Sequence, residues 1–169
     1  MTFEDLTTSR DLADAAATLA INILGPIRLT DALVDHLTRQ PDAAIVTVTS
    51  GLAYVPPVAA PTYSASKAAM HSYTVSLRTQ LEGKVEVIEL APPGVQTDLT
   101  PGQANRPGYM PLEAFADAVA AQFAQTPTPR EILVDEVQFL RQAEREGRFD
   151  ETLRTLTERA AQQRAAGGQ

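Results

Sequence analysis

Residues 43–51 read AAIVTVTSG, and this stretch decides the fold class that the rest of the chain must follow. Its first seven residues are apolar or β-branched, and turn-forming residues stand on both sides of them. Short runs of this kind are typical of buried strands. We therefore expect a strand over residues 43–49 that ends at Ser50.

Helical and extended patterns alternate on both sides of this strand. The expected elements are, in chain order, a helix over about 10–39 bent at Gly25 and Pro26, the strand 43–49, a proline-rich loop over 51–61, a helix over 62–82, a strand over 84–90, an irregular loop over 95–111, a helix over about 112–125, a strand over 131–134 and one or two charged helices over about 136–164. Strands that alternate with helices are typical of a parallel sheet with helices on both faces. The sequence therefore predicts an α/β fold with about three strands and flanking helices.

The composition is that of an ordinary acidic globular protein. The chain has 169 residues, 44% of them hydrophobic, which favours one domain. The absence of cysteine excludes disulfides, thiolate nucleophiles and cysteine-based zinc sites. A net charge of −7 and a pI near 4.8 argue against nucleic acids and anionic membranes as partners. The sequence contains no run of 18 apolar residues, so no membrane span is predicted. The cytoplasm is the expected compartment.

A tyrosine and a lysine lie four residues apart in Tyr63–Lys67, YSASK. On a helix the two side chains share a face. A nearby ammonium favours the tyrosinate form, so Lys67 is expected to lower the pKa of Tyr63 toward the working pH of a general acid or base. Ser50 ends a predicted strand, which is where α/β folds place reactive groups. We expect Ser50, Tyr63 and Lys67 to form one site.

Four motifs place this set in a wider pattern: NILG at residues 22–25, VTSG at 48–51, YSASK at 63–67 and PGVQTDL at 93–99. In this order and spacing they resemble the short-chain dehydrogenase/reductase family, over about residues 10–135. The resemblance implies the C-terminal part of a Rossmann-like doubly wound parallel sheet. It also implies NAD(P)-dependent interconversion of a carbonyl and an alcohol.

The resemblance assigns roles by position to four catalytic residues. Tyr63 would exchange a proton with the substrate oxygen, and Ser50 would hydrogen-bond that oxygen. Lys67 would lower the tyrosine pKa and bind the nicotinamide ribose. Asn22 would hold a water that links Lys67 to solvent.

The resemblance also implies ligand-binding positions. Tyr63, Lys67 and the segment Pro93, Gly94, Val95 and Thr97 would contact the nicotinamide end of NAD or NADP, with the Thr97 hydroxyl on the carboxamide. Ser50, Tyr54 and Tyr109 would contact a small carbonyl or alcohol substrate, with Tyr109 on a loop that closes over it.

The Asn22 position can also be argued from the backbone. Pro26 has no N–H, so in an α-helix the carbonyl of Asn22 is left without its partner. A water relay and a simple helix kink both predict this free carbonyl.

The two histidines have simpler interpretations. His36 lies near a helix end, where a cation is favoured. His71 shares a helix face with Lys67, and packing is its expected use. Neither has a paired acid at ligand spacing, so no metal site is predicted.

The chain departs from the family pattern at its N-terminal side. The Gly-rich turn that seats a pyrophosphate on a helix N-terminus is missing, since no G-x-G occurs. Three explanations are open: a fragment of a longer enzyme, a shortened protein that acts as a non-catalytic dimerisation or interaction module, and a short enzyme that rebuilds its cofactor site by oligomerising. We expect weak or no cofactor binding by this chain.

The expected organisation is a truncated catalytic part over residues 1–135 and a helical extension with a frayed tail over 136–169. The helices over about 10–39 and 62–82 carry apolar residues on more than one side. With one flank of the strand 43–49 bare, the expected state is a homodimer or higher oligomer.

Overall fold

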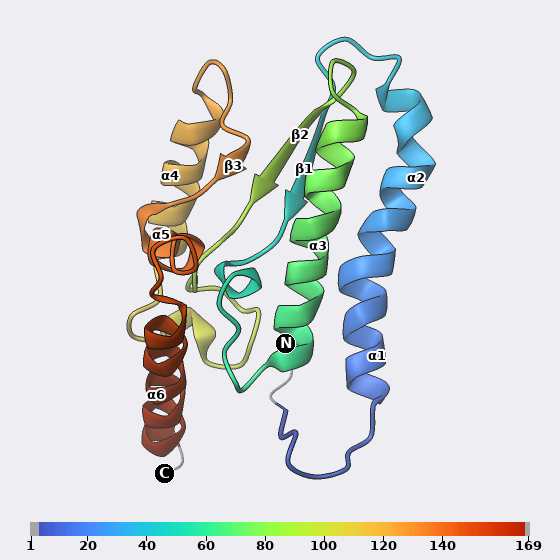
Figure 1. Ribbon diagram of the computed structural model, residues 1–169. Helices are drawn as coiled ribbons and strands as arrows, with labels where there is room; N and C mark the ends of the chain where they lie inside the picture. The colour runs from blue at the N-terminus through green and yellow to red at the C-terminus, as the bar shows by residue number, and fades with distance from the viewer. Residues whose placement is uncertain (1–3, 168–169) are drawn as a thin grey trace.

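The computed structural model describes residues 4–167, and its strands form one parallel sheet (Figure 1). The strands are β1 (Ala44–Val48), β2 (Glu86–Leu90) and β3 (Glu131–Ile132), in the order β1-β2-β3. Ala44 pairs with Glu86 at one end of β1, and Val48 pairs with Leu90 at the other. The predicted α/β fold with about three parallel strands is confirmed.

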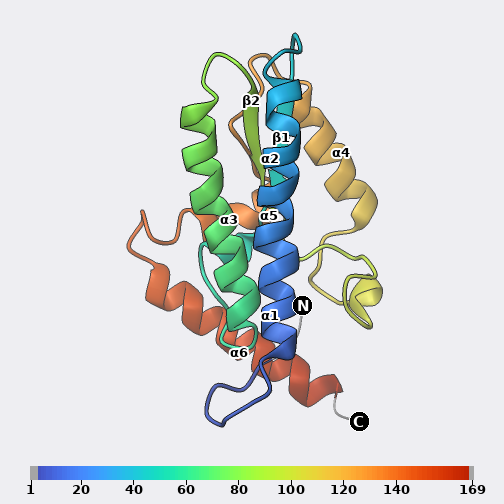
Figure 2. The ribbon, with the colours of Figure 1, turned by 90° about the vertical axis from the view of Figure 1, so that its right-hand side faces the viewer.

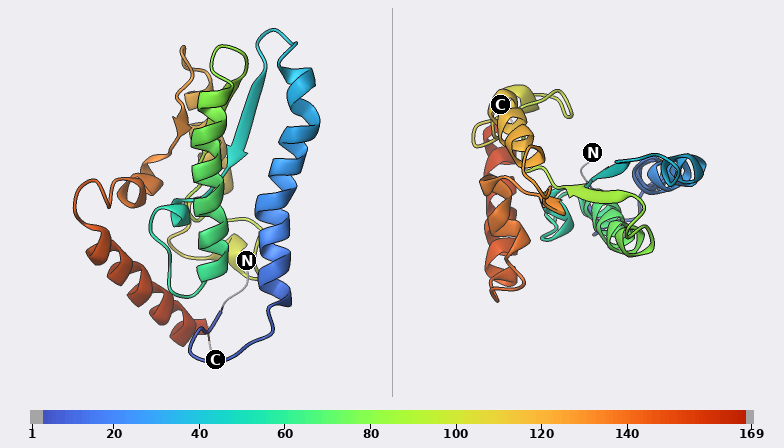
Figure 3. Two further views of the ribbon diagram at one scale, coloured as in Figure 1. Left: turned by 45° about the vertical axis from the view of Figure 1, so that its right-hand side comes forward. Right: turned by 90° about the horizontal axis from the view of Figure 1, so that it is seen from above.

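The helices lie on both sides of this sheet. They are α1 (Ala13–Leu19), α2 (Gly25–Leu37), α3 (Pro61–Gln80), α4 (Leu112–Phe123), α5 (Asp135–Arg141) and α6 (Phe149–Gly167). Figures 2 and 3 show α3 and α4 on opposite sides of the strands, as expected for a doubly wound sheet. The break between α5 and α6 contains Gly147, whose positive φ of 68° ends the helical path.

The C-terminal boundary differs from the sequence prediction. A frayed tail is expected from residue 164, but α6 continues to Gly167. The alanine-rich sequence before Gly167 favours helix. Residues 168–169 lie outside the described part of the chain.

A wide helical turn joins α1 to α2. Residues Ala20–Leu24 form a π turn, and the Gly25 N–H donates to the carbonyl of Ala20. Pro26 follows directly, so an irregular turn lies next to the position of the predicted bend, and the bend itself stays a prediction. The argument for a free Asn22 carbonyl assumes the hydrogen-bond spacing of an α-helix, whereas Asn22 lies in a π turn. The free carbonyl therefore stays a prediction.

Two buried clusters hold the layers together. Leu77 of α3 and Leu81, which directly follows this helix, pack on Val85 and Val87 around β2, with Val34 and Leu37 of α2 at their margin. The second cluster joins the loop after β1 to the C-terminal helices, and its buried members are Val55, Val137, Leu140 and Ala143. The second cluster fixes the segment that follows Ser50.

The N-terminal helices and β1 expose apolar side chains. No residue of α1 or α2 is buried, and Ile21 and Leu29 are 71% and 62% exposed. Val46 and Val48 of β1 are also exposed, and β1 pairs with β2 alone among the described strands. By length and composition alone, the helical stretch Ala13–Leu37 is long and apolar enough to cross a membrane. It passes on average hydropathy, since its apolar residues do not form one uninterrupted run. A single helix of this kind is weak evidence for a membrane span, because core helices of globular proteins meet the same criteria of length and composition.

Candidate active site

Ser50 lies where β1 ends, at the carboxyl edge of the sheet. The backbone fastens it on both sides, because Thr49 N–H donates to Leu90 (2.9 Å) and Gly51 N–H donates to Pro92 (2.9 Å). Its Oγ accepts from the Leu52 N–H at 3.2 Å, which starts the 3₁₀ turn Gly51–Ala53. Ser50 is 8% exposed and held by this turn.

Tyr63 and Lys67 lie one turn apart at the start of α3. Pro61 begins the helix, where its fixed φ is favourable and no N–H is needed. The Lys67 Nζ donates to the carbonyl of Val48 at 3.0 Å and lies 5.6 Å from the centre of the Tyr63 ring. The lysine therefore ties α3 to the strand that carries Ser50.

The structure changes the expected electrostatics of Tyr63. Burial raises the pKa of the Tyr63 phenol, a side-chain hydrogen bond with Ser50 lowers it, and the nearby Tyr109 phenol raises it. The net shift is upward, so the prediction that Lys67 lowers this pKa is wrong for this structure. The physical reason is that burial of the phenol outweighs the groups that lower its pKa, while the Lys67 ammonium is bonded to the Val48 carbonyl.

Asn22 reaches the same helix through a serine. Its Nδ2 donates to Ser66 Oγ at 3.0 Å, and Ser66 Oγ donates to the carbonyl of Tyr63 at 2.6 Å. The wide turn thus places Asn22 beside α3, and its direct partner there is Ser66. The partner is 44 residues away in the sequence, so no local pattern indicates it.

The segment after β2 packs against the loop that carries Tyr109. Gly94 accepts from the Met110 N–H at 2.8 Å, and a Cβ on Gly94 would lie 3.0 Å from the Tyr109 ring. The Thr97 Oγ1 accepts from Gln103 Nε2 at 3.1 Å. The nicotinamide contacts assigned to Pro93, Gly94, Val95 and Thr97 stay predictions, as does the Tyr109 substrate contact.

Tyr54 is engaged by a different group of side chains. Its hydroxyl donates to Glu89 Oε1 at 3.1 Å, and the Arg141 guanidinium lies 4.9 Å from its ring centre. Burial and the Glu89 carboxylate raise the pKa of Tyr54. The substrate contact of Tyr54 stays a prediction, and in this structure its hydroxyl is bonded to Glu89.

His71 also contacts Glu89, with Nδ1 2.8 Å from Oε2. It therefore has a specific polar partner in addition to packing. Tyr54 and His71 line a hollow together with Leu140 and Arg141, and Ser50 and Tyr63 are not among its lining residues. Within residues 4–167, no group of three or more histidine, aspartate or glutamate side chains could hold a metal ion.

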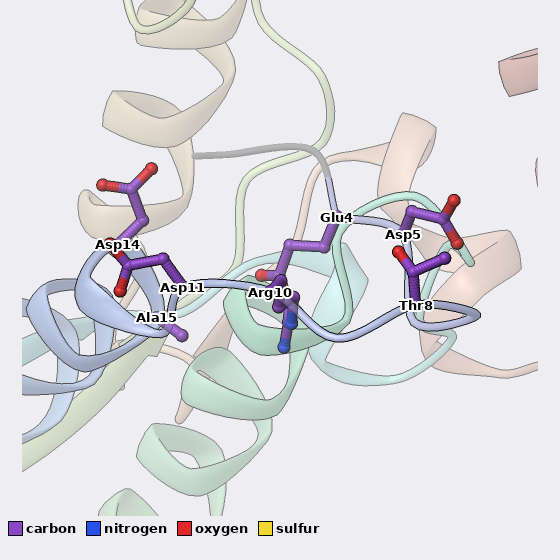
Figure 4. A pocket seen from close by; sticks show the side chains of 7 residues that line it. All are labelled: Glu4, Asp5, Thr8, Arg10, Asp11, Asp14 and Ala15. Carbon is purple, nitrogen blue, oxygen red and sulfur yellow. The ribbon is translucent and has the colours of Figure 1, made fainter.

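A further hollow lies along the N-terminal segment and is shown in Figure 4. Glu4 forms an ion pair with Arg10 and accepts from Thr62 Oγ1 at 2.7 Å. Thr62 precedes Tyr63, so this segment is fastened to the first turn of α3. The hollow is lined by residues 4–15 and contributes no side chain to the Ser50 site.

Comparison with known families decides the ancestry of this site. The sequence profile of the family described as short chain dehydrogenase matches residues 3–107, more than half of the chain. The chain belongs to this family of oxidoreductases. The matched range contains Asn22, Ser50, Tyr63, Lys67 and residues 93–97, as the motif resemblance predicted.

Individual relatives agree with this membership. The chain is 46% identical over 91 residues to the uncharacterized oxidoreductase DltE of Bacillus subtilis, covering 53% of this chain and 36% of that protein. It is 39% identical over 102 residues to the C-signal protein of Myxococcus xanthus, covering 57% and 61% respectively. A short chain dehydrogenase from Burkholderia cenocepacia, solved in complex with NADP, superposes with a TM-score of 0.76 at 25% identity, covering 92% of this chain and 66% of that one.

The chain spans about a third of the length of several curated relatives. It covers 36% of the Bacillus protein and 32% of the 11-beta-hydroxysteroid dehydrogenase-like 2 protein of Arabidopsis thaliana. Membership in the short-chain dehydrogenase family therefore holds for the part of the fold that carries the candidate site.

Lys67 gives a first test of this site that needs no ligand. Burial lowers the pKa of its ammonium below the ordinary 10.5. In the pH range between the lowered and the ordinary value the folded chain binds fewer protons at Lys67 than the unfolded chain, so this group favours folding increasingly as pH rises through that range.

Lys67 and Lys84 are the chain's two lysines, and Lys84 is exposed. We expect ¹³C-methylated Lys67 to titrate below the ordinary lysine value of 10.5 in an NMR pH series, with Lys84→Met assigning the two signals. Titration of Lys67 at or above the ordinary value would contradict the described environment of this side chain.

Proposed function

We propose that Ser50, Tyr63 and Lys67 form the proton-transfer apparatus of an NAD(P)-dependent oxidoreductase that interconverts a carbonyl and an alcohol. The observation that carries the proposal is the meeting of three groups at one sheet edge. The Ser50 hydroxyl lies near enough to the Tyr63 phenol to lower the pKa of that phenol, and Lys67 Nζ donates to the Val48 carbonyl of the strand that ends at Ser50. A hydroxyl next to a phenol can hold one substrate oxygen within reach of a proton donor.

The chain's own residues would act in reduction as follows. Tyr63 donates its phenolic proton to the carbonyl oxygen of the substrate. Ser50 donates a hydrogen bond to the same oxygen and fixes its distance from Tyr63. Lys67 holds α3 against the strand that ends at Ser50, because its ammonium donates to the Val48 carbonyl. Asn22 supports the first turn of α3 through Ser66.

The residues present fit only one end of a nicotinamide dinucleotide. Lys67 and Tyr63 offer an ammonium and a phenol to a ribose, and the segment 93–97 follows β2 at the same edge of the sheet. When bound, the nicotinamide supplies or accepts the hydride. Residues 4–167 contain no Gly-rich strand-to-helix turn for the pyrophosphate.

We therefore expect this 169-residue chain to bind the cofactor weakly or not at all. A dissociation constant of about 1 mM or weaker corresponds to a binding free energy no more favourable than about −4 kcal/mol. Calorimetric titration with NADH and with NADPH measures this, with titration into buffer as the control. Micromolar binding to the chain by itself would contradict the expectation.

A second candidate function is a non-catalytic dimerisation or interaction module. The exposed apolar side chains of α1, α2 and the turn between them favour it, since large apolar patches mark association surfaces. Under this alternative, Tyr63→Phe leaves the biological activity unchanged. Under the enzyme proposal, the same substitution removes most turnover.

Self-association through this surface is a prediction of its own. We expect the wild-type chain to sediment as a dimer or larger oligomer, and the double variant Ile21→Glu, Leu29→Glu to sediment as a monomer, because the substituted carboxylates would have to be buried. Leu112→Glu on α4, where the leucine is 53% exposed, is the matched control and should leave the sedimentation unchanged. A monomeric wild type in analytical ultracentrifugation would overturn this prediction.

A further inference from the structure

Glu89 is a fully buried carboxylate in the middle of the fold. It lies on β2 between Ile88 and Leu90, and its side chain has no exposed surface. Strands of parallel sheets are usually continuous apolar runs, so a glutamate at this place is unusual. Burial of a carboxylate is costly unless its oxygens accept hydrogen bonds.

Three side chains from three segments contact the Glu89 oxygens. Thr49 Oγ1 donates to Oε1 at 2.7 Å, and the Tyr54 hydroxyl donates to the same oxygen at 3.1 Å. His71 Nδ1 lies 2.8 Å from Oε2 and 3.0 Å from Oε1. These contacts satisfy both oxygens of the buried group.

The three partners surround the candidate site. Thr49 directly precedes Ser50, and Tyr54 directly follows the 3₁₀ turn that starts at Ser50. His71 lies on α3, one turn beyond Lys67. One carboxylate thus connects both ends of the serine turn to the helix that carries Tyr63 and Lys67.

An outer layer of charge keeps this group in place. Arg141 lies over the Tyr54 ring and binds Glu131 with two hydrogen bonds of 2.8 and 2.9 Å. Glu131 stands opposite Glu89 in the register of β2 and β3. The negative charge of Glu131 is therefore paired with the Arg141 guanidinium, and the Glu89 carboxylate accepts hydrogen bonds from Thr49 and Tyr54.

We propose that Glu89 is a positioning residue that sets the Ser50 hydroxyl against the Tyr63 phenol by holding the serine turn and α3 together. The proposal rests on the proposed function, because it assigns Glu89 to the same proton-transfer site. Glu89 touches neither Ser50 nor Tyr63, and it acts through Thr49, Tyr54 and His71.

The test uses NMR of the full chain, with ¹³C-labelled tyrosine and ¹⁵N-labelled histidine, and needs no cofactor. In Glu89→Gln, which keeps the size of the side chain, we expect the Tyr63 Cζ resonance to shift. Tyr73, which packs in the cluster around Leu77, is expected to stay in place. We also expect the ring ¹⁵N resonances of His71 to shift, because a glutamine amide replaces the carboxylate that contacts Nδ1.

Glu86→Gln is the matched control, since Glu86 is an exposed glutamate on the same strand. It should shift neither Tyr63 nor His71. If Glu89→Gln lowers the melting temperature while the Tyr63 resonance stays at its wild-type position, the role of Glu89 is only structural and the proposal fails.

Thr49→Val covers the case in which Glu89→Gln does not fold. This substitution removes one contact to Glu89 and keeps the shape of the threonine. A shifted Tyr63 resonance supports the proposal, and an unshifted one overturns it. Because these readouts do not depend on turnover, they can fail while the proposed function stands, and the reverse also holds.

Discussion

Replacing Gly51 by alanine is expected to destabilise the chain by roughly 1–3 kcal/mol, the usual cost of overpacking a core. A Cβ at Gly51 would lie 2.6 Å from Val137 Cγ2 and 2.7 Å from Leu140 Cδ1. Both side chains belong to a buried cluster and have little room to move. The substitution would therefore push α5 away from the turn that holds Ser50.

Thermal unfolding followed by circular dichroism measures this effect. For a chain of this size, each kcal/mol lowers the melting temperature by about 2–4 °C. Gly25→Ala is the control, since its Cβ would meet nothing closer than the Ala20 carbonyl oxygen at 3.6 Å. Alanine in a helix is favoured over glycine by roughly 0.5–1 kcal/mol, so the control should melt at the wild-type temperature or above. A Gly51→Ala variant as stable as wild type would show that the packing described around this glycine is wrong.

The order of the elements could be read from the sequence because each one has a strong local pattern. The run AAIVTVT gave β1 (Ala44–Val48), and KVEVIEL gave β2 (Glu86–Leu90), each within two residues. Turn-forming residues lie before and after both strands. Alternation with helices then restricts the sheet to parallel pairing.

The interior of the site could not be read in the same way, because its contacts join residues far apart in the chain. Glu89 lies within the predicted strand 84–90, and its partners Thr49 and Tyr54 lie 40 and 35 residues away. The one signal in the sequence is an acidic residue between Ile88 and Leu90. A carboxylate buried in a strand needs hydrogen-bond donors, so its presence there indicates polar partners from elsewhere in the fold.

The electrostatic prediction for Tyr63 failed for a related reason. Spacing along a helix predicts that Lys67 lies near the tyrosine, and it does. Spacing does not predict that the Val48 carbonyl accepts from the ammonium or that burial dominates the pKa of the phenol. The sign of the shift depends on these tertiary contacts.

Tyr63→Phe is the substitution with the largest expected effect on activity. It removes the phenolic hydroxyl and keeps the ring whose centre lies 5.6 Å from the Lys67 ammonium. General acid–base groups contribute about 10²- to 10⁴-fold to rate, so turnover should fall by at least about 100-fold. Tyr73→Phe is the matched control, because Tyr73 is on the same helix and packs in the cluster around Leu77.

The most direct test of the proton-transfer site is the rate of carbonyl reduction by the wild-type chain, Tyr63→Phe and Tyr73→Phe. A panel of ketones and aldehydes with several millimolar NADPH or NADH compensates for weak cofactor binding. We predict that wild type and Tyr73→Phe turn over a common substrate at similar rates, and that Tyr63→Phe is slower by about 100-fold or more. A Tyr63→Phe variant that matches the wild-type rate would contradict the assignment of Tyr63 as the proton donor.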